Sequence, residues 1–256
     1  MVNLIRMDLY RMFKTRSFQV CLAFAFALSL ASTPLEVLLF NLAKSLAPEA
    51  ETLPLPETAE LSSMIRSPLA LLTTLLVTLS VVFFYFADME NGYIKNIAGQ
   101  MPKRGFSILS RYLASAVHNV IFMLVCAAGS IIGTMLFRKI LADDGITDAV
   151  FTFFLKLLLL QSVCAVLLLV TAGLRSKSFG IVLAVLFGIG AMSLLYAGID
   201  SALGMLIKGF VISPYMPDNL LGEGRPDTVK ALLSAAVTIA VFLPLSISVF
   251  DRRDVK

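Results

Sequence analysis

Apolar residues run in blocks of about 20 along most of the chain, a length that lets a helix cross roughly 30 Å of hydrocarbon. Short charged segments separate the blocks. The runs are Ser17 to Phe40, Leu69 to Ala87, Leu113 to Phe137, Phe151 to Gly173, Phe179 to Ile199 and Val229 to Phe250. Each run is continuously apolar rather than alternating, which favours helices over a β-barrel. The pattern predicts an all-α membrane protein with six transmembrane helices.

The composition agrees with this pattern. The 256 residues are 58% hydrophobic and 15% charged, and the mean hydropathy is +0.89, which lies outside the range of water-soluble domains. Cys21, Cys126 and Cys164 all fall inside apolar runs, where a free thiol acts as a small apolar side chain. We therefore expect a multi-pass membrane protein without disulfides.

Ionisable side chains avoid the middle of the apolar runs. Glu36 and Asp200 lie near the outer ends of their runs, and Asp88 lies at an inner end. Lys156 is close enough to an outer end for its ammonium to reach the interface. An intramembrane enzyme or an ion-coupled carrier needs ionisable groups near the midplane, so the pattern disfavours both classes.

Basic residues concentrate on one side of the predicted spans. They lie before the first run, between the second and third, between the fourth and fifth, and in the tail over 251–256, whereas the opposite loops hold most of the acids. The positive-inside rule therefore places both termini in the cytoplasm. The same distribution explains the formal charge of +4 and the pI near 9.0 without any binding of nucleic acid.

The first 16 residues have the pattern of an amphipathic helix. One face carries apolar side chains, and Arg6, Tyr10 and Lys14 lie opposite. Such a helix is expected to lie on the inner membrane surface and lead into the first span. A cleaved signal peptide is the alternative, because Ser29 to Ala31 resembles a signal-peptidase site, but the apolar run continues well beyond it. The apolar face comprises Val2, Ile5, Leu9, Met12 and Phe13.

Two longer segments face the outside in this topology. Residues 41–68 are rich in Pro and Glu and form an extracellular loop. Residues 201–227 begin with an apolar stretch too short to span, followed by turn-forming residues, which favours a re-entrant or interfacial helical segment. The permease domain would then cover 17–250, and no segment between spans is long enough for a catalytic domain.

Polar side chains inside the spans are few. His118 and Asn119 lie in the third run and Gln161 in the fourth. A metal site or a proton relay is one interpretation of His118, but no HExxH or paired spacing accompanies it. Hydrogen bonds between helices are the favoured interpretation for all three residues, and no metal is expected.

Small residues recur at helical spacing in two runs. Gly129 and Gly133 form a GxxxG pattern, and Gly180, Ala184 and Gly188 repeat every fourth position. Such stripes allow close helix approach, within one subunit or across a dimer. The segment GLRSKS over 173–178 lacks the spacing of a Walker A motif, so we expect no ATP binding by this route.

The cytoplasmic segment over 88–112 stands out by its charge. A short helix is predicted to begin at Glu90 and to stop at Gly99, with Tyr93 and Ile94 on one side, and a second helix follows after Arg104. Two short helices joined by a basic turn suit docking into a groove of a partner protein. A solvated loop that merely obeys the positive-inside rule fits the residues equally well.

Several features in order resemble one family. They are the stretch MDLYRMFKTRSF from Met7 to Phe18, the loop pattern E-x-G-x-x-K-x8-R at Glu90, Gly92, Lys95 and Arg104, and the tail FDRRDVK. Together with six spans and two cytoplasmic ends, they make the whole chain similar to the permease subunits of type-2 ATP-binding cassette (ABC) exporters, including bacitracin and lantibiotic export or immunity permeases.

The resemblance implies a half-transporter that is not itself an enzyme. It would pair with a second permease, identical or different, and bind cytoplasmic ABC ATPase subunits that hold ATP and magnesium. The first cytoplasmic loop would be the coupling helix, beside an elbow helix over 1–16. Candidate coupling residues are Glu90, Gly92, Tyr93, Ile94, Lys95 and Arg104, and candidate elbow residues are Arg6, Leu9, Arg11 and Phe13.

The implied cargo is a hydrophobic or amphipathic compound, such as an antimicrobial peptide, exported across a bacterial cell membrane. A different class also fits the residues: a non-transporting scaffold or sensor subunit whose loop recruits a cytoplasmic signalling protein. The exporter would be favoured if a neighbouring gene encoded a nucleotide-binding protein with a Walker A motif.

Overall fold

The computed structural model describes residues 2–46, 58–66, 71–90, 105–141, 145–174, 176–206 and 212–252. Helices dominate these residues, and the apolar lengths confirm a multi-pass, helical membrane protein. The helices are α1 (Val2–Lys14), α2 (Arg16–Leu46), α3 (Leu61–Arg66), α4 (Leu71–Glu90), α6 (Gly105–Phe137), α7 (Ile146–Leu174), α8 (Lys177–Gly188), α9 (Met192–Leu206), α10 (Pro217–Gly222) and α11 (Thr228–Arg252). A short 3₁₀ helix, η1 (Ser213–Tyr215), precedes α10.

Four helices in the described part of the chain are long and apolar enough to cross a membrane, namely α2, α6, α7 and α11. They match four of the predicted runs. The apolar stretch of α4, Leu72–Ala87, is shorter than the length expected of a full span.

The predicted continuous helix over Phe179 to Ile199 is wrong. The chain forms α8 and α9 there, and the two helix axes are bent by 81°. Gly190 lies at the break with φ of 69°, a left-handed conformation that ends α8. Joined, the two helices would be long enough to make a fifth span.

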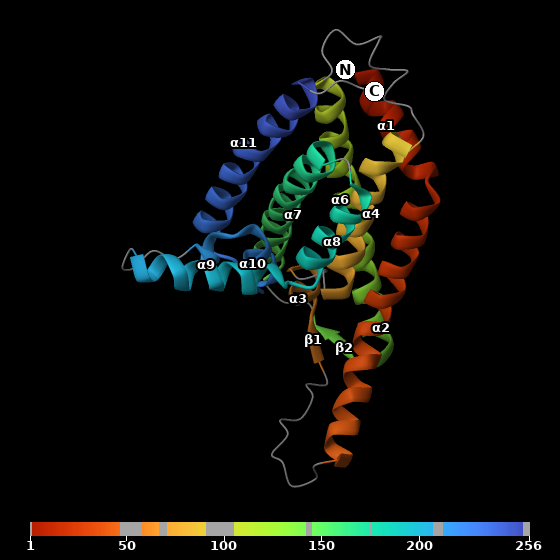
Figure 1. Cartoon of the computed structure of the whole chain (residues 1–256). Coiled ribbons are helices and arrows are strands. Elements are labelled where there is room, and N and C mark those ends of the chain that lie inside the picture. Colours follow the sequence, from red (N-terminus) through yellow and green to blue (C-terminus); the bar gives the residue numbers. More distant parts are fainter. Residues whose placement is uncertain are drawn as a thin grey trace.

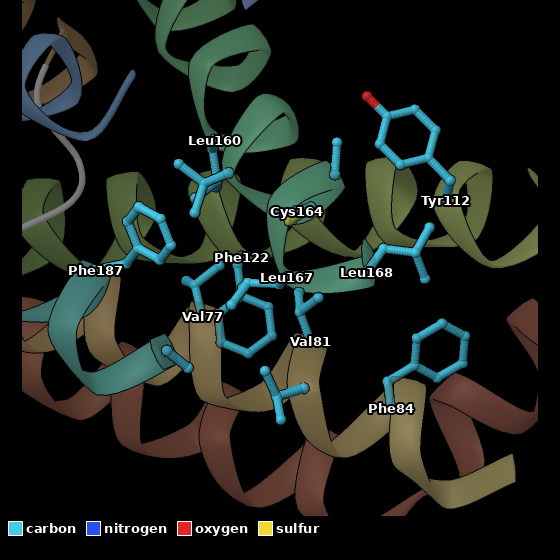
Figure 2. Close-up of a cluster of buried hydrophobic side chains, with 14 of the residues drawn as sticks. Val77, Val81, Phe84, Tyr112, Phe122, Leu160, Cys164, Leu167, Leu168 and Phe187 are labelled. Atoms are coloured by element: carbon cyan, nitrogen blue, oxygen red, sulfur yellow. The ribbon is translucent and has the colours of Figure 1, made fainter. Parts of the chain in front are cut away.

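The core of the bundle forms around α7, which is the most deeply buried of the four long helices. Figure 2 shows side chains of α4, α6, α7 and α8 converging, among them Val81, Phe122, Leu167 and Phe187. By contrast, α2 and α11 keep most of their apolar surface exposed, as expected where lipid replaces water.

The two ends of the bundle differ (Figure 1). At one end, here called the termini end, α1, the last turn of α4, the first turn of α6 and the last turn of α11 come together. At the other, the cap end, lie α3, α9, α10 and the strands β1 (Thr58–Glu60) and β2 (Lys139–Leu141), which pair in parallel. The helix α9 lies crosswise to the long helices.

The segment 41–68 is more structured than an open loop. Its last part forms β1 and then α3, which packs against α7 and buries Met64 and Ser62. The register pairs Thr58 with Lys139 and Glu60 with Leu141. Lys156 of α7 was expected to reach the interface with its ammonium; the residue is only 2% exposed, so other parts of the protein cover it.

Candidate functional site

The termini end is built by the docking of α1 on α6. The Ser110 hydroxyl donates a hydrogen bond to the carboxylate of Asp8, and both side chains are buried. Met12 is fully buried one turn further along α1. On the opposite side, Tyr10 and Phe13 stay exposed, with 63% and 44% of their surface accessible. The helix α1 therefore exposes two aromatic rings among basic side chains, as an interfacial helix does, while a buried carboxylate ties it to α6.

The predicted elbow residues are divided between these two sides. Leu9 and Arg11 are half-buried, and Arg6 is exposed together with Phe13. Phe13 also packs edge-on against Phe18 of α2, with 5.5 Å between ring centroids. Asp8 was not among the predicted residues, because a carboxylate on the packed face of an amphipathic helix leaves no signal in the hydrophobic pattern.

The first turn of α6 packs closely against α11. A Cβ at Gly105 would lie 2.6 Å from Cγ2 of Ile247 and 3.1 Å from a carboxylate oxygen of Asp251, so only glycine fits without a shift. The predicted coupling residues 92–104 lie outside the described residues. Glu90 is the last residue of α4, and nothing is described of its side chain. The segment thus joins the end of α4 to the start of α6, and α6 packs against both α1 and α11.

Basic side chains gather at this end. They come from α1, from the first turn of α2, from α6, α8 and α11, and they are Arg6, Arg11, Lys14, Arg16, Arg111, Lys177 and Arg252. The acids on the described backbone of this end are fewer, namely Asp8, Asp88, Glu90 and Asp251. The excess of positive charge is the pattern that the positive-inside rule associates with the cytoplasmic side.

A second feature is a buried polar network in the middle of the bundle. It joins α4, α6 and α7 through hydrogen bonds of 2.8 to 3.2 Å. The three polar residues singled out in the sequence lie next to one another in it. Its members are Ser80, Tyr112, Ser115, His118, Asn119, Gln161 and Cys164.

The backbone carbonyl of Tyr112 determines which side chains donate and which accept along the network. The Gln161 amide nitrogen donates to the carbonyl oxygen of Tyr112 at 2.9 Å, so the Gln161 oxygen faces Asn119. Asn119 donates its amide to that oxygen at 2.9 Å and turns its own oxygen toward His118 Nδ1. His118 must therefore carry its proton on Nδ1 and accept from the Ser80 hydroxyl at Nε2, 2.9 Å away.

The histidine has no room for a further ligand. Its ring stacks on Phe122 with 4.5 Å between centroids and lies 5.4 Å from the ring of Phe18. Both ring nitrogens are used within the network. Among the described residues, no group of three or more His, Cys, Asp or Glu side chains could hold a metal ion. The network can hold three helices in one register, because shifting any of them would leave buried polar atoms unpaired.

Each glycine stripe lies against a helix of the same chain. Gly133 of α6 packs directly on the Leu30 backbone of α2, and a Cβ at Gly129 would lie 3.0 Å from the Phe26 carbonyl oxygen. On α8, a Cβ at Gly188 would meet the backbone of Leu75 in α4. The stripes bring α6 against α2 and α8 against α4.

The remaining members of the α8 stripe face the same helix. A Cβ at Gly180 would lie 3.2 Å from side-chain atoms of Val82 and Phe86. Ala184 is fully buried, and its carbonyl oxygen accepts a hydrogen bond of 3.0 Å from Thr78 of α4.

Charged side chains join the elements of the cap end. Asp148, at the start of α7, forms two ion pairs through its Oδ2 atom. The Nη2 atom of Arg66 in α3 lies 3.3 Å away, and the Nη2 atom of Arg225 lies 3.5 Å away. Arg138, after α6, pairs with Glu36 of α2 at 3.2 Å. These ionic contacts connect short cap elements to long helices, but they are partly exposed, so each contributes little to stability.

Two further carboxylates lie in the cap. Asp200 of α9 accepts backbone N–H groups of Ile212 and Ser213 at 2.6 and 3.0 Å, which ties α9 to η1. Asp218 of α10 has both carboxylate oxygens buried. This burial raises the pKa of Asp218, against the opposing effect of nearby backbone N–H groups and Tyr196.

Neither models of known protein families nor curated proteins give a significant match to this chain.

Proposed function

We propose that the chain is the transmembrane permease subunit of an ATP-binding cassette exporter in a bacterial cell membrane. In this proposal six segments span the membrane, with α8 and α9 together as the fifth, and both termini lie in the cytosol. The exported compound is hydrophobic or amphipathic, such as an antimicrobial peptide. ATP and magnesium are bound by separate ATPase subunits, and a second permease, identical or different, completes the transporter.

One observation carries the proposal. The ends of α4 and α6 that flank 91–104 lie at the termini end of the bundle (Figure 1), where α6 packs on α1 and α11 and basic side chains are in excess. Positive charge favours the cytosolic side for this end. The sequence that joins these two core helices is short and polar, which suits contact with a soluble partner, and the resemblance to type-2 exporters supplies the identity of that partner.

The described contacts suggest how a force on this segment would spread. The start of α6 is held by α1 through Asp8 and Ser110 and by α11 at Gly105. Further along, α6 is joined to α4 through His118 and Ser80 and to α7 through Asn119 and Gln161. A push on 91–104 would therefore move α4, α6 and α7 as one body, because the buried network resists sliding between them.

Co-purification tests the proposal. The tagged chain is extracted from its own cells in a mild detergent, and an unrelated multi-pass protein with the same tag serves as control. We expect a stoichiometric partner with a Walker A motif and magnesium-dependent ATP hydrolysis in the eluate. A partner without nucleotide binding would favour the scaffold or sensor function, and repeated recovery of the chain with no ATPase would contradict the proposal.

A further inference from the structure

The junction between α8 and α9 is a complete helix-ending motif. The N–H of Ala191 donates to the Leu186 carbonyl at 2.9 Å, and the N–H of Gly190 donates to the Phe187 carbonyl at 3.2 Å. With Gly190 left-handed, these bonds form a Schellman motif. Ser193, in the first turn of α9, then donates its backbone N–H at 3.2 Å and its hydroxyl at 2.7 Å to the Gly190 carbonyl oxygen. The bend therefore keeps its backbone groups hydrogen-bonded and is a stable state of this sequence.

The same residues also suit a straight helix. The 12 residues of α8 rise about 18 Å, well short of a bilayer core of about 30 Å. Lys177 to Ala202 as one helix would rise about 39 Å and satisfy the length and hydropathy of a span. Moreover, α9 exposes large apolar side chains in the bent form, including Leu194 at 76% and Leu195 at 54%. Nothing in the composition favours the bend over the straight span.

We propose that Gly190 is the hinge of a two-state helix, in which α8 and α9 join into one straight membrane-spanning helix in a second state of the protein. This inference rests on the proposed function for its role, because straightening would carry α9 away from η1 and α10 and so rearrange the cap end during export. The contacts of Asp200 with the N–H groups of Ile212 and Ser213 hold the bent state, since straightening must break them.

A pair of glycine substitutions isolates the hinge. A Cβ at Gly190 meets no atom within 4 Å, so Gly190→Ala adds no clash and acts only through φ. The left-handed conformation disfavours alanine and a continuous helix favours it, so the ratio of straight to bent molecules should rise about tenfold to a hundredfold. A Cβ at Gly198 of α9 also meets open space, but its φ is not in the left-handed region. Gly198→Ala is therefore the matched control.

The distance between spin labels at positions 179 and 201 reports the bend. Both positions are exposed. Eleven residues lie on each side of Gly190, so an 81° bend gives a separation of about 25 Å and a straight helix about 33 Å. The full chain would be reconstituted in lipid nanodiscs and measured by double electron–electron resonance, with Cys21, Cys126 and Cys164 replaced by alanine.

We expect the unsubstituted hinge and Gly198→Ala to populate mainly the shorter distance, and Gly190→Ala to shift the distribution to the longer one. Asp200→Ala leaves Gly190 intact and should also shift the distance distribution to the longer distance. This variant therefore tests the hinge if Gly190→Ala fails to fold. An unchanged distribution in the folded variants would overturn the hinge. The measurement needs no ATPase, so its failure is distinct from failure of the co-purification.

Discussion

Gly133 offers the sharpest prediction about the packing of the bundle. A Cβ at this position would overlap the backbone carbonyl group of Leu30 and lie 3.2 Å from the Leu30 Cα. The obstacle is backbone, so no change of rotamer can make room, and α2 and α6 must separate. Gly133→Ala is therefore expected to lower stability although it adds only one methyl group.

The size of the effect can be worked from the neighbouring contacts. Overpacking of a tight interface costs about 1–3 kcal/mol. Separation would also weaken the buried hydrogen bond between Thr33 and Thr134, which is 2.8 Å long and lies one residue along α6. Hydrogen bonds between membrane helices contribute about 0.6 kcal/mol on average, so the total loss is expected at about 1.5–3.5 kcal/mol.

The assay is reversible unfolding of the full chain by SDS in mixed micelles, followed by circular dichroism. Gly129→Ala should cost less than Gly133→Ala, because a Cβ at Gly129 would come no closer than 3.0 Å to any neighbour. Gly198→Ala, in open space, should be close to neutral. If Gly133→Ala were as stable as Gly198→Ala, the close approach of α2 to α6 through Gly133 would be refuted.

Three further outcomes are expected. Gln161→Leu should destabilise the chain by about 1–3 kcal/mol in the same assay, because it leaves the amide of Asn119 without its oxygen partner, and a neutral result would show that the polar network does not hold the helices together. Asp218→Asn should raise the melting temperature at pH 7. Burial raises the pKa of Asp218, so the native state should become more stable as the pH falls toward that pKa. The stability of Asp218→Asn should not increase in this way, because asparagine does not titrate. The same dependence of melting temperature on pH in both proteins would contradict the buried carboxylate. Gly92→Ala in the co-purified complex should leave ATP hydrolysis intact and reduce peptide resistance of cells, and full resistance would count against a coupling role.

The apolar runs were sufficient to predict α2, α6, α7 and α11. Length and hydropathy alone decide whether a helix can cross a bilayer, and both are properties of the local sequence. The break at Gly190 was missed because glycine is common in membrane helices, and whether it turns left-handed depends on contacts made elsewhere, such as Asp200 with η1. The strands β1 and β2 were missed for a related reason, since their pairing joins residues about 80 positions apart.

For the candidate sites too, the local sequence predicts single residues but not how the helices pack them together. His118, Asn119 and Gln161 could be selected individually, because a polar side chain in an apolar run needs a partner. Their assembly into one network depends on the rotation of α4, α6 and α7 about their axes, and hydropathy does not encode that rotation. The burial of Lys156 depends likewise on the packing of the cap end, which the pattern of α7 alone does not contain.

We propose that an ATPase pushes on the segment after α4. Site-specific photo-crosslinking in intact cells tests it most directly, with a benzophenone amino acid at position 93 and, as control, at position 225, where the arginine side chain is 68% exposed at the cap end. We expect an adduct between position 93 and a nucleotide-binding protein, and none from position 225. Capture of that protein from position 225, or of no nucleotide-binding protein from position 93, would contradict it.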